Sequence, residues 1–278
     1  MKIFSLILFV YLIIFNSAGY SWGDKGHSLI NGKAIAFLPA EMDQFKKWGD
    51  YIAEHAPDPD YRKEYDSTEF PKHFIDIDYY REFQTGNMIF GMNQLKSIYS
   101  DSIVNDLGIL PWATIETLNK LTDAFRELDR DRVLIYASDL GHYVGDGHQP
   151  MHTILNYDGQ LSTQEGVHGR YEWQMLDRYI NEVDSSIIRS EAEYVNNPLE
   201  YVFGYITNSN TVASVLLDAD LQAFKTAGNR EDDNYFNLLW FRTKYITTIQ
   251  FNKAVQSFSS LIYTAWIDAG KPPLNKLN

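Results

Sequence analysis

Apolar residues recur every three to four positions along most of the chain, which is the period of an amphipathic α-helix. The first such pattern runs from Leu29 to Leu38 and stops at Pro39, which disfavours a helical conformation in the residue before it. Comparable patterns predict further helices at residues 41–56, 88–98, 112–128, 131–149, 168–182, 198–227 and 231–269. Strand signals are few. The sequence therefore predicts an all-α, multi-helix fold that forms one domain over residues 22–278.

Two short segments interrupt the helical pattern. Pro57 and Pro59 flank Asp58, and because proline is unsuited to a helix interior we expect residues 57–60 to form a loop. Apolar and polar residues alternate over residues 74–78, which is typical of an extended chain.

The first residues of the chain predict a targeting segment. Lys2 precedes an apolar run over residues 3–15, and small residues follow this run. The run is too short to span a bilayer comfortably, so we predict a signal peptide at residues 1–21 and no transmembrane anchor.

The predicted signal peptide has two candidate cleavage points. Cleavage after Ser21 makes Trp22 the first mature residue, and cleavage after Gly19 is the alternative. Either one predicts export, to a periplasm or to the extracellular space.

Composition narrows the possible functions. The 278 residues include 19 Tyr, 16 Phe and 6 Trp, which is typical of a folded chain with a substantial core. The formal net charge of −13 argues against tight binding of long duplex nucleic acid through a basic face. A bound cation could still attract a small phosphate ester. The chain has no cysteine, which excludes disulfides, thiolate metal sites and cysteine nucleophiles.

The candidate chemistry is concentrated between residues 142 and 172, which hold four of the seven histidines. His142 and Asp146 are four residues apart, as are His168 and Glu172, so each pair shares one face of a predicted helix. An isolated pair of this kind is usually an ordinary polar contact. Two such pairs with His152 between them offer the imidazole and carboxylate ligands that zinc accepts. The first pair also lies in an apolar segment, where buried polar groups need a partner.

A set of motifs carries a resemblance to a known superfamily. In chain order they are Trp22-Gly-x-x-Gly-His27, His73-Phe74, Pro111-Trp112, Gly141-His-x-x-Gly-Asp-x-His-Gln-Pro-Met-His152 and Ala265-Trp-Ile-Asp-Ala-Gly270. The set resembles the zinc-dependent superfamily that joins the single-strand-specific nucleases of the S-one/P-one type with the bacterial zinc phospholipases C. The resemblance runs from residue 22 to about residue 180 and returns near the C-terminus. It implies an all-helical phosphodiester hydrolase that holds three zinc ions.

Carried over residue by residue, the resemblance implies three ligand sets. One zinc would take Asp58, His73, His142 and Asp146, a second would take His152, His168 and Glu172, and the third would take the amine and carbonyl of Trp22 with His27 and a bridging Asp146. Asp58 is preferred within the loop at 57–60, with Asp60 as the alternative. Asp58 and Asp146 are then the expected catalytic residues.

Two further residues are expected to contact the substrate. Phe74 would stack on a base or line a lipid pocket, although packing in the core is an equal alternative. Arg62 is the counterpart of an arginine that the nucleases carry three residues after the loop aspartate, although here it follows Asp58 by four residues and Asp60 by two.

The resemblance leaves the substrate class open. The Trp22-x4-His27 spacing is nuclease-like, whereas Tyr171 before Glu172 is closer to the phospholipase pattern. The main hypothesis is an exported, nuclease-like hydrolase of single-stranded nucleic acid or nucleotides. The alternatives are a zinc-dependent phospholipase C acting on phosphatidylcholine-like lipids and a non-catalytic protein with a structural zinc cluster. We expect His148 to be a supporting residue and not a ligand, and nothing in the sequence predicts a stable protein partner.

Overall fold

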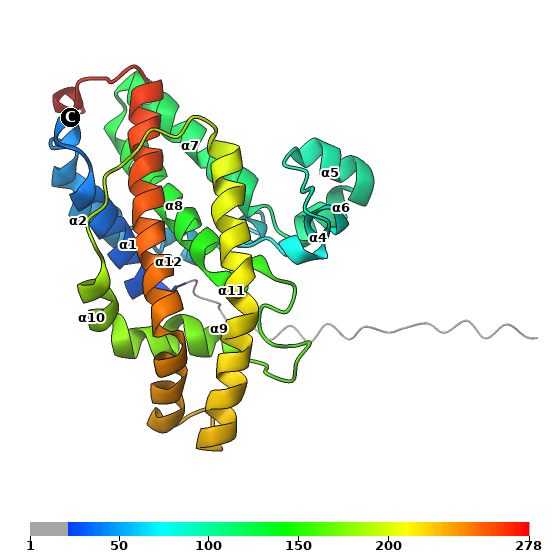
Figure 1. The fold of residues 1–278 in the computed structure, drawn as a ribbon. Coiled ribbons are helices and arrows are strands. Elements are labelled where there is room, and N and C mark those ends of the chain that lie inside the picture. Colours follow the sequence, from blue (N-terminus) through cyan, green and yellow to red (C-terminus); the bar gives the residue numbers. More distant parts are fainter. Residues whose placement is uncertain (1–21, 278) are drawn as a thin grey trace, which may run out of the picture.

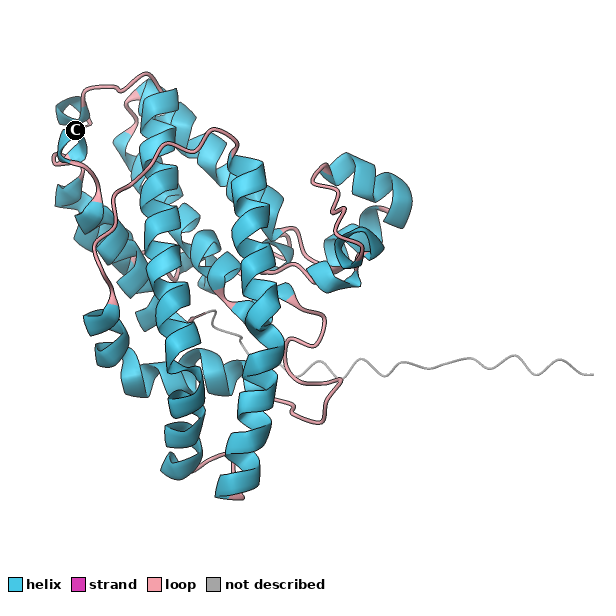
Figure 2. Ribbon diagram, in the orientation of Figure 1, coloured by secondary structure: helices cyan, strands magenta, loops and turns pink. Residues whose placement is uncertain are grey.

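The protein is described by a computed structural model over residues 22–277, and the predicted signal peptide at residues 1–21 lies outside the described residues. Within this range the regular secondary structure is entirely helical, as Figure 2 shows. The prediction of an all-α fold is therefore confirmed. Across residues 22–277, no helix combines the length and the apolar character that crossing a membrane requires.

The elements follow one another along the chain with short connections. The α-helices are α1 (Gly23–Phe37), α2 (Gly49–Glu54), α3 (Asp58–Arg62), α4 (Arg81–Gln84), α5 (Met92–Tyr99), α6 (Asp101–Asp106), α7 (Leu110–Glu127), α8 (Arg130–His148), α9 (Val167–Gly169), α10 (Leu176–Ser186), α11 (Pro198–Ala227) and α12 (Asp233–Asp268). Short 3-10 helices are η1 (Ala40–Met42), η2 (Lys46–Trp48), η3 (Phe70–His73), η4 (Ile77–Tyr79), η5 (Pro150–Thr153) and η7 (Leu274–Lys276), and η6 (Arg170–Met175) is a π-helix.

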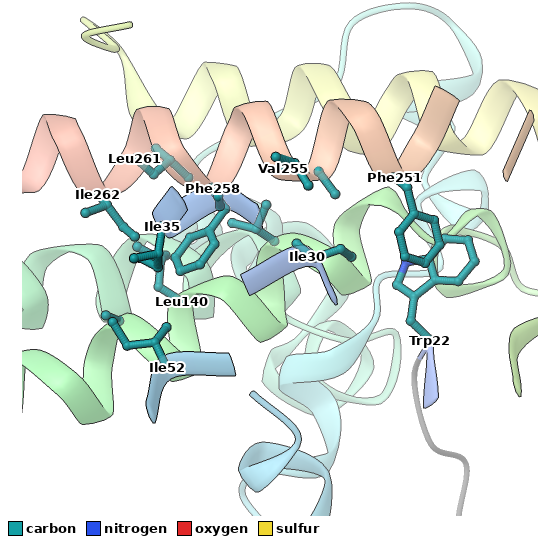
Figure 3. Close-up of a cluster of buried hydrophobic side chains, with 14 of the residues drawn as sticks. Trp22, Ile30, Ile35, Ile52, Leu140, Phe251, Val255, Phe258, Leu261 and Ile262 are labelled. Atoms are coloured by element: carbon teal, nitrogen blue, oxygen red, sulfur yellow. The ribbon is translucent and has the colours of Figure 1, made fainter. Parts of the chain in front are cut away.

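The long helices form a bundle around α8. In Figure 1, α11 and α12 run side by side along the front of the molecule, and α8 lies behind them with α1 and α7 as neighbours. The core lies between these helices: Figure 3 shows Ile30 and Ile35 of α1, Leu140 of α8 and Phe258 of α12 packed together, all fully buried. Each such side chain contributes about 1.5–3 kcal/mol by leaving water. The core therefore fixes α8, which carries the first candidate ligand pair.

A smaller lobe formed by α4, α5 and α6 projects to one side of the bundle (Figure 1). Leu95 of α5 and Val104 of α6 are buried in a second apolar cluster, which Phe203 and Ile206 of α11 join. The lobe is thus tied to the bundle through the first half of α11.

Local signals in the sequence account for several helix boundaries. Asn197 caps α11 by accepting from Glu200 N, and Gly228 ends the helix with a φ of +76°, a conformation that glycine adopts without a steric penalty. Asp232 caps α12 in the same way by accepting from Tyr235 N. The predicted range of 198–227 therefore matches α11 at both ends.

Three local predictions were wrong. Residues 57–60 contribute to the short helix α3, because Pro57 lies at the cap and Pro59 in the first turn, where the missing amide hydrogen is not needed. Residues 41–56 divide into η1, η2 and α2. Residues 74–78 are extended only at Phe74 and then enter η4.

Candidate metal centre

Helix α8 supplies the central pair of side chains. Asp129 caps the helix by accepting from Arg132 N, and the helix then enters the core, where His142 and Asp146 are fully buried. His142 Nε2 lies 3.3 Å from Asp146 Oδ2, as the four-residue spacing predicted. His142 Nδ1 lies 2.9 Å from the carbonyl oxygen of Ala56, which directs Nε2 toward Asp146.

Helix α1 brings His27 against this pair. The His27 ring stacks on the His142 ring with centroids 4.0 Å apart, and its Nε2 lies 3.5 Å from Asp146 Oδ1. This approach requires glycine at position 145, because a Cβ there would lie 2.9 Å from His27 Nδ1. Gly145 thus admits the imidazole beside the helix backbone.

The segment between α2 and η3 contributes His73 and Asp60. His73 Nδ1 lies 3.0 Å from Asp146 Oδ2 and 3.4 Å from Asp60 Oδ1, and His142 Nε2 lies 3.6 Å from the same Asp60 oxygen. We call His27, Asp60, His73, His142 and Asp146 the inner group.

The structure brings Asp60, and not the preferred Asp58, to the inner group. The Asp58 side chain is 45% exposed and lies 2.8 Å from His55 Nδ1, whereas the Asp60 side chain is 1% exposed and faces the inner group. Two residues of helix correspond to a rotation of about 200°, so the two carboxylates leave α3 on opposite sides. The rigid first turn at Pro57 and Pro59 therefore decides which aspartate is buried.

A second cluster lies beyond His152. His152 Nε2 lies 3.1 Å from His168 Nε2 and 3.1 Å from Glu172 Oε1, and His168 Nε2 lies 2.9 Å from Glu172 Oε2. We call these three residues the outer group. The His168 side chain is 18% exposed, so this end of the centre is accessible from solvent. Asp146 Oδ1 lies 3.7 Å from His152 Nδ1 and connects the two groups.

Trp22 lies at the same centre. Its backbone nitrogen donates to Glu172 Oε1 at 2.6 Å, and its buried indole donates from Nε1 to the carbonyl oxygen of Gly145 at 2.8 Å. The structure therefore places the Trp22 nitrogen beside the outer group. The ligand set implied by the sequence resemblance joined it instead to His27 and Asp146.

The outer group rests on an unusual helix. His168 is in α9, and Glu172 is in the π-helix η6, a form that is rare and concentrated at functional sites. Between them, Arg170 donates to Asp220 of α11 from Nε at 3.2 Å and from Nη2 at 3.0 Å. Tyr235 of α12 also donates its hydroxyl to Asp220. This buried pair ties the backbone between two candidate ligands to both long helices.

The residues present fit a metal cluster. Several buried side-chain atoms in the centre have no well-formed hydrogen bond: both ring nitrogens of His27, both carboxylate oxygens of Asp146 and Oε2 of Glu172. His27 Nε2 lies within ion-pair distance of Asp146 Oδ1, and Glu172 Oε2 lies within ion-pair distance of His168 Nε2. Such atoms converge on shared points in space. Three triplets have this arrangement: His27 with Asp60 and His142, His73 with His142 and Asp146, and His152 with His168 and Glu172. Ligands about 2.05 Å from a tetrahedral zinc lie about 3.3 Å apart, which matches these separations.

Burial and neighbouring charges shift the pKa values of the side chains in the centre. Burial and the neighbouring His27 lower the pKa of His142 to about 4, so this imidazole is neutral at pH 7. Burial opposes ionisation of Asp146, but His142 and His152 outweigh it and hold the pKa well below the usual range. Burial also acts against charge on His152, but Asp146 and Glu172 raise its pKa to about 9. Metal binding at neutral pH must therefore displace a proton from His152.

Arg62 is predicted to contact the substrate, and in the structure two carboxylates hold its guanidinium. Arg62 donates to both carboxylate oxygens of Asp139, at 3.1 and 2.8 Å, and to Glu69 at 3.4 Å, so its guanidinium is held behind His73. The cation beside the inner group is Lys63, whose Nζ lies 2.6 Å from Asp60 Oδ1. Lys63 follows Asp60 by three residues, which is the spacing that the nuclease arginine has.

The aromatic side chain exposed near the centre is not Phe74. Phe74 is half-buried and packs edge-on against Phe70, with ring centroids 5.3 Å apart, while Phe70 itself is 59% exposed. Tyr61, which follows Asp60, is also exposed and donates its hydroxyl to Asp24 at 2.8 Å. The sequence signals for both residues were their positions next to candidate ligands.

Two other residues have supporting positions. His148 lies away from both ligand groups, where its Nε2 is 3.0 Å from Ser257 Oγ and its ring stacks on Tyr205. Asp76 is buried, and burial together with Asp78 raises its pKa to about 7. Sequence reasoning missed Glu69, although it precedes His73 by the same four residues that separate the other histidine and carboxylate partners.

Comparison with known proteins supports the architecture. No protein-family model matches the chain, and no curated protein matches it. Among solved structures, alpha toxin from Clostridium absonum matches with a TM-score of 0.51 at 14% sequence identity. The match covers 88% of this chain and 63% of the toxin chain, so this chain spans less than two thirds of the toxin. The two proteins share an all-helical fold.

Proposed function

We propose that the protein is an exported, zinc-dependent phosphodiester hydrolase of the phospholipase C type. The observation that carries the proposal is the convergence of buried imidazole and carboxylate atoms into three triplets, one of which reaches solvent at His168. Nitrogen and oxygen donors at these separations suit zinc, and an accessible ligand group is typical of a catalytic site. A structural site would instead fill every coordination position of zinc with protein ligands.

The side chains of this chain divide the work of such a reaction. Bound zinc would lower the pKa of water and stabilise charge on phosphate oxygens. Asp146 would hold the two groups together, because it lies within 3.7 Å of histidines in both. Lys63 would contact a phosphate that binds at the inner group, since its ammonium lies at the Asp60 carboxylate. No serine or cysteine nucleophile is needed.

Two features favour a choline-like lipid head group over a nucleotide base. Tyr61, which follows Asp60 in α3, and Phe70, which begins the η3 helix that ends at His73, have exposed aromatic rings, and aromatic faces attract quaternary ammonium groups. The carboxylate of Asp24 lies at the Tyr61 hydroxyl and adds negative charge where a cation would bind. The sequence pattern at Tyr171 and Glu172 is consistent with this substrate class.

A single-strand nuclease is the second candidate. The Trp22-x4-His27 spacing favours it, and the exposed ring of Phe70 would serve equally as a stacking platform for a base. The −13 net charge does not distinguish the two, because a metal cluster dominates the local field.

A hydrolysis screen tests the proposal. Zinc-loaded protein with Trp22 at its N-terminus is incubated with phosphatidylcholine vesicles, single-stranded DNA and RNA, with the Asp146→Asn variant as the control. Release of phosphocholine by the wild-type protein alone supports the phospholipase. Cleavage of DNA or RNA without lipid hydrolysis supports the nuclease.

Metal content tests the basis of both candidates. Chelation should abolish activity and lower the melting temperature, because metal that binds only the folded state stabilises it. If the protein retains less than about one zinc per chain after expression with zinc, the proposal fails. Bound zinc without hydrolysis even of bis-p-nitrophenyl phosphate would indicate a structural cluster.

A further inference from the structure

Glu69 lies directly behind His73, on the side away from the ligand groups. His73 Nδ1 faces Asp146 and Asp60, whereas His73 Nε2 is buried, makes no hydrogen bond and lies 3.6 Å from Glu69 Oε1. Within residues 22–277, Glu69 is the only carboxylate within ion-pair distance of this nitrogen. The Glu69 side chain is itself buried, so its position is set by its partners.

Those partners fix the two oxygens of Glu69 differently. Oε2 accepts from Arg62 Nε at 3.4 Å and from Lys72 Nζ at 2.9 Å, and Oε1 accepts from the Tyr143 hydroxyl. Arg62 and Lys72 therefore both hold Oε2, and Oε1 faces His73. Tyr143 follows His142 on α8, so the same helix that carries a ligand also places Glu69.

The geometry points to Glu69 as the positioning residue for His73: it selects the imidazole form with the proton on Nε2, which leaves Nδ1 to bind metal. An imidazole that binds metal through one nitrogen carries its proton on the other, and an acceptor there fixes the form and the ring orientation. The inference rests on the proposed zinc site, and it explains why Arg62 is turned away from the substrate: its charge holds Glu69 in place through Oε2.

Glu69→Gln tests this role with little change in shape. The amide must keep its oxygen toward Arg62 and Lys72, because both are cationic donors. Its NH2 group then faces His73 Nε2 and favours the opposite imidazole form, in which Nδ1 carries the proton. Zinc dissociation constants from chelator competition should rise about 10- to 100-fold, as is typical when the partner of a ligand histidine is removed.

Asp139→Asn is the matched control. Asp139 is the other carboxylate partner of Arg62, at 2.8 Å, but it does not contact His73. This variant should bind zinc within about twofold of the wild-type protein if orientation of His73 is what matters. Equal weakening in Asp139→Asn and Glu69→Gln would overturn the inference, because it would trace the effect to Arg62.

Nitrogen-15 NMR of the histidine rings provides a readout that general destabilisation would not move. His73, assigned with a His73→Gln variant, should show a protonated Nε2 in the wild-type and Asp139→Asn proteins, and this signal should be lost in Glu69→Gln. An unchanged His73 signal with unchanged zinc affinity in Glu69→Gln would overturn the inference. If that variant does not fold, Tyr143→Phe removes one donor to Oε1 without a change in charge: a few-fold weaker zinc binding would support the inference and none would overturn it.

The outcomes separate this inference from the proposed function. A wild-type protein that binds no zinc contradicts the proposed function, and with it the inference that rests on the zinc site. A wild-type protein that binds zinc, with a Glu69→Gln variant that behaves identically, contradicts only the role of Glu69.

Discussion

The inner and outer groups differ in how their side chains are held. His142 and Asp146 of the inner group are on one long, regular helix, α8, whose residues 140–148 are buried and which contacts α1, α7 and α12. The outer group is carried by a 3-10 helix, a three-residue α-helix and a π-helix, and His168 is partly exposed. Helix geometry and core packing fix the inner group, whereas the ion pair of Arg170 with Asp220 fixes the outer one.

This difference indicates a division of roles within one centre. A rigid, buried group can hold its ligands in fixed positions, while short elements around a partly exposed group leave its ligands freer to move. Because the outer group is carried by short elements and not by one long helix, its geometry depends on a few specific contacts. Substitution of a residue that contacts both groups should therefore reduce activity and zinc binding the most. Substitution of a residue that supports one group should weaken zinc binding at that group alone.

Asp146→Asn should have the largest effect, because Asp146 lies within 3.7 Å of histidines in both groups. The change keeps the shape but removes the charge, and we expect a loss of activity of more than about a hundredfold together with loss of zinc, since removing even a residue behind a ligand costs about 10- to 100-fold. Assays of turnover and elemental zinc check this. His148→Asn is the control, and equal losses in the two variants would contradict the assignment of His148 as a bystander.

An extension before Trp22 should act mainly on the outer group. The Trp22 nitrogen lies 2.6 Å from Glu172, and it can bind metal only as a free amine, whose pKa is near 8. A version that retains one residue before Trp22 has an amide there, so we expect it to fold, to lose about one zinc per chain and to be nearly inactive. Mass spectrometry must establish each N-terminus. Equal zinc content and turnover would exclude Trp22 as a ligand and favour cleavage after Gly19.

Asp60→Asn and Asp58→Asn should show which of the two aspartates supports zinc binding at the inner group. Asp60 faces His73 and His142, while Asp58 pairs with His55 on the exposed side of α3. We expect Asp60→Asn to weaken zinc binding at the inner group by at least about tenfold and Asp58→Asn to leave it unchanged. Zinc titration with a competing chelator measures both. The reverse order would restore Asp58 as the ligand.

Asp220→Asn should loosen the outer group while the inner group persists. The change leaves the Arg170 guanidinium buried without its carboxylate, which destabilises a fold by about 3–5 kcal/mol. Thermal unfolding measures this, and zinc titration should show weaker binding at one class of site only. Asp233→Asn, which removes an exposed partner of Arg178, should leave the melting temperature unchanged. A uniform loss of all zinc in Asp220→Asn would contradict independent support of the two groups.

Asp76→Asn should have the smallest effect on function and a pH-dependent effect on stability. Burial and Asp78 raise the pKa of Asp76 to about 7, above its value in the unfolded chain near 3.9. The folded state therefore binds more protons between these values, and stability falls as pH rises through this window. Removing the charge should stabilise the metal-free protein by about 1–4 kcal/mol at pH 8 and leave it unchanged near pH 3.

Asp66→Asn is the opposite case, because hydrogen bonds from Thr68 lower the pKa of Asp66. Denaturant unfolding at both pH values checks the signs.

Several features were predictable because they depend on neighbouring residues alone. The bounds of α11 follow from Asn197, Pro198 and Gly228, and the spacing of His142 and Asp146 places both on one face of a helix. The clustering of histidines between residues 142 and 172 also identified most of the candidate centre. These signals are local, so they survive without knowledge of the packing.

Other features could not be predicted from the sequence because they depend on direction in space. Two aspartates two residues apart differ in role because α3 turns one toward His73 and the other toward solvent. Arg62 and Lys63 are adjacent, yet one lies behind His73 and the other at the Asp60 carboxylate. Sequence spacing within an irregular segment does not specify which side chain faces inward.

The sequence by itself determined the helical fold, the buried helix at residues 130–148 and the chemistry of the candidate ligands, because periodicity and residue type act over a few positions. Tertiary structure alone decided that Asp60 and not Asp58 joins the inner group, that Trp22 meets Glu172 across 150 residues of chain, and that Glu69 stands behind His73. The physical reason is that these contacts join separate elements, whose relative placement is set by packing of the whole core.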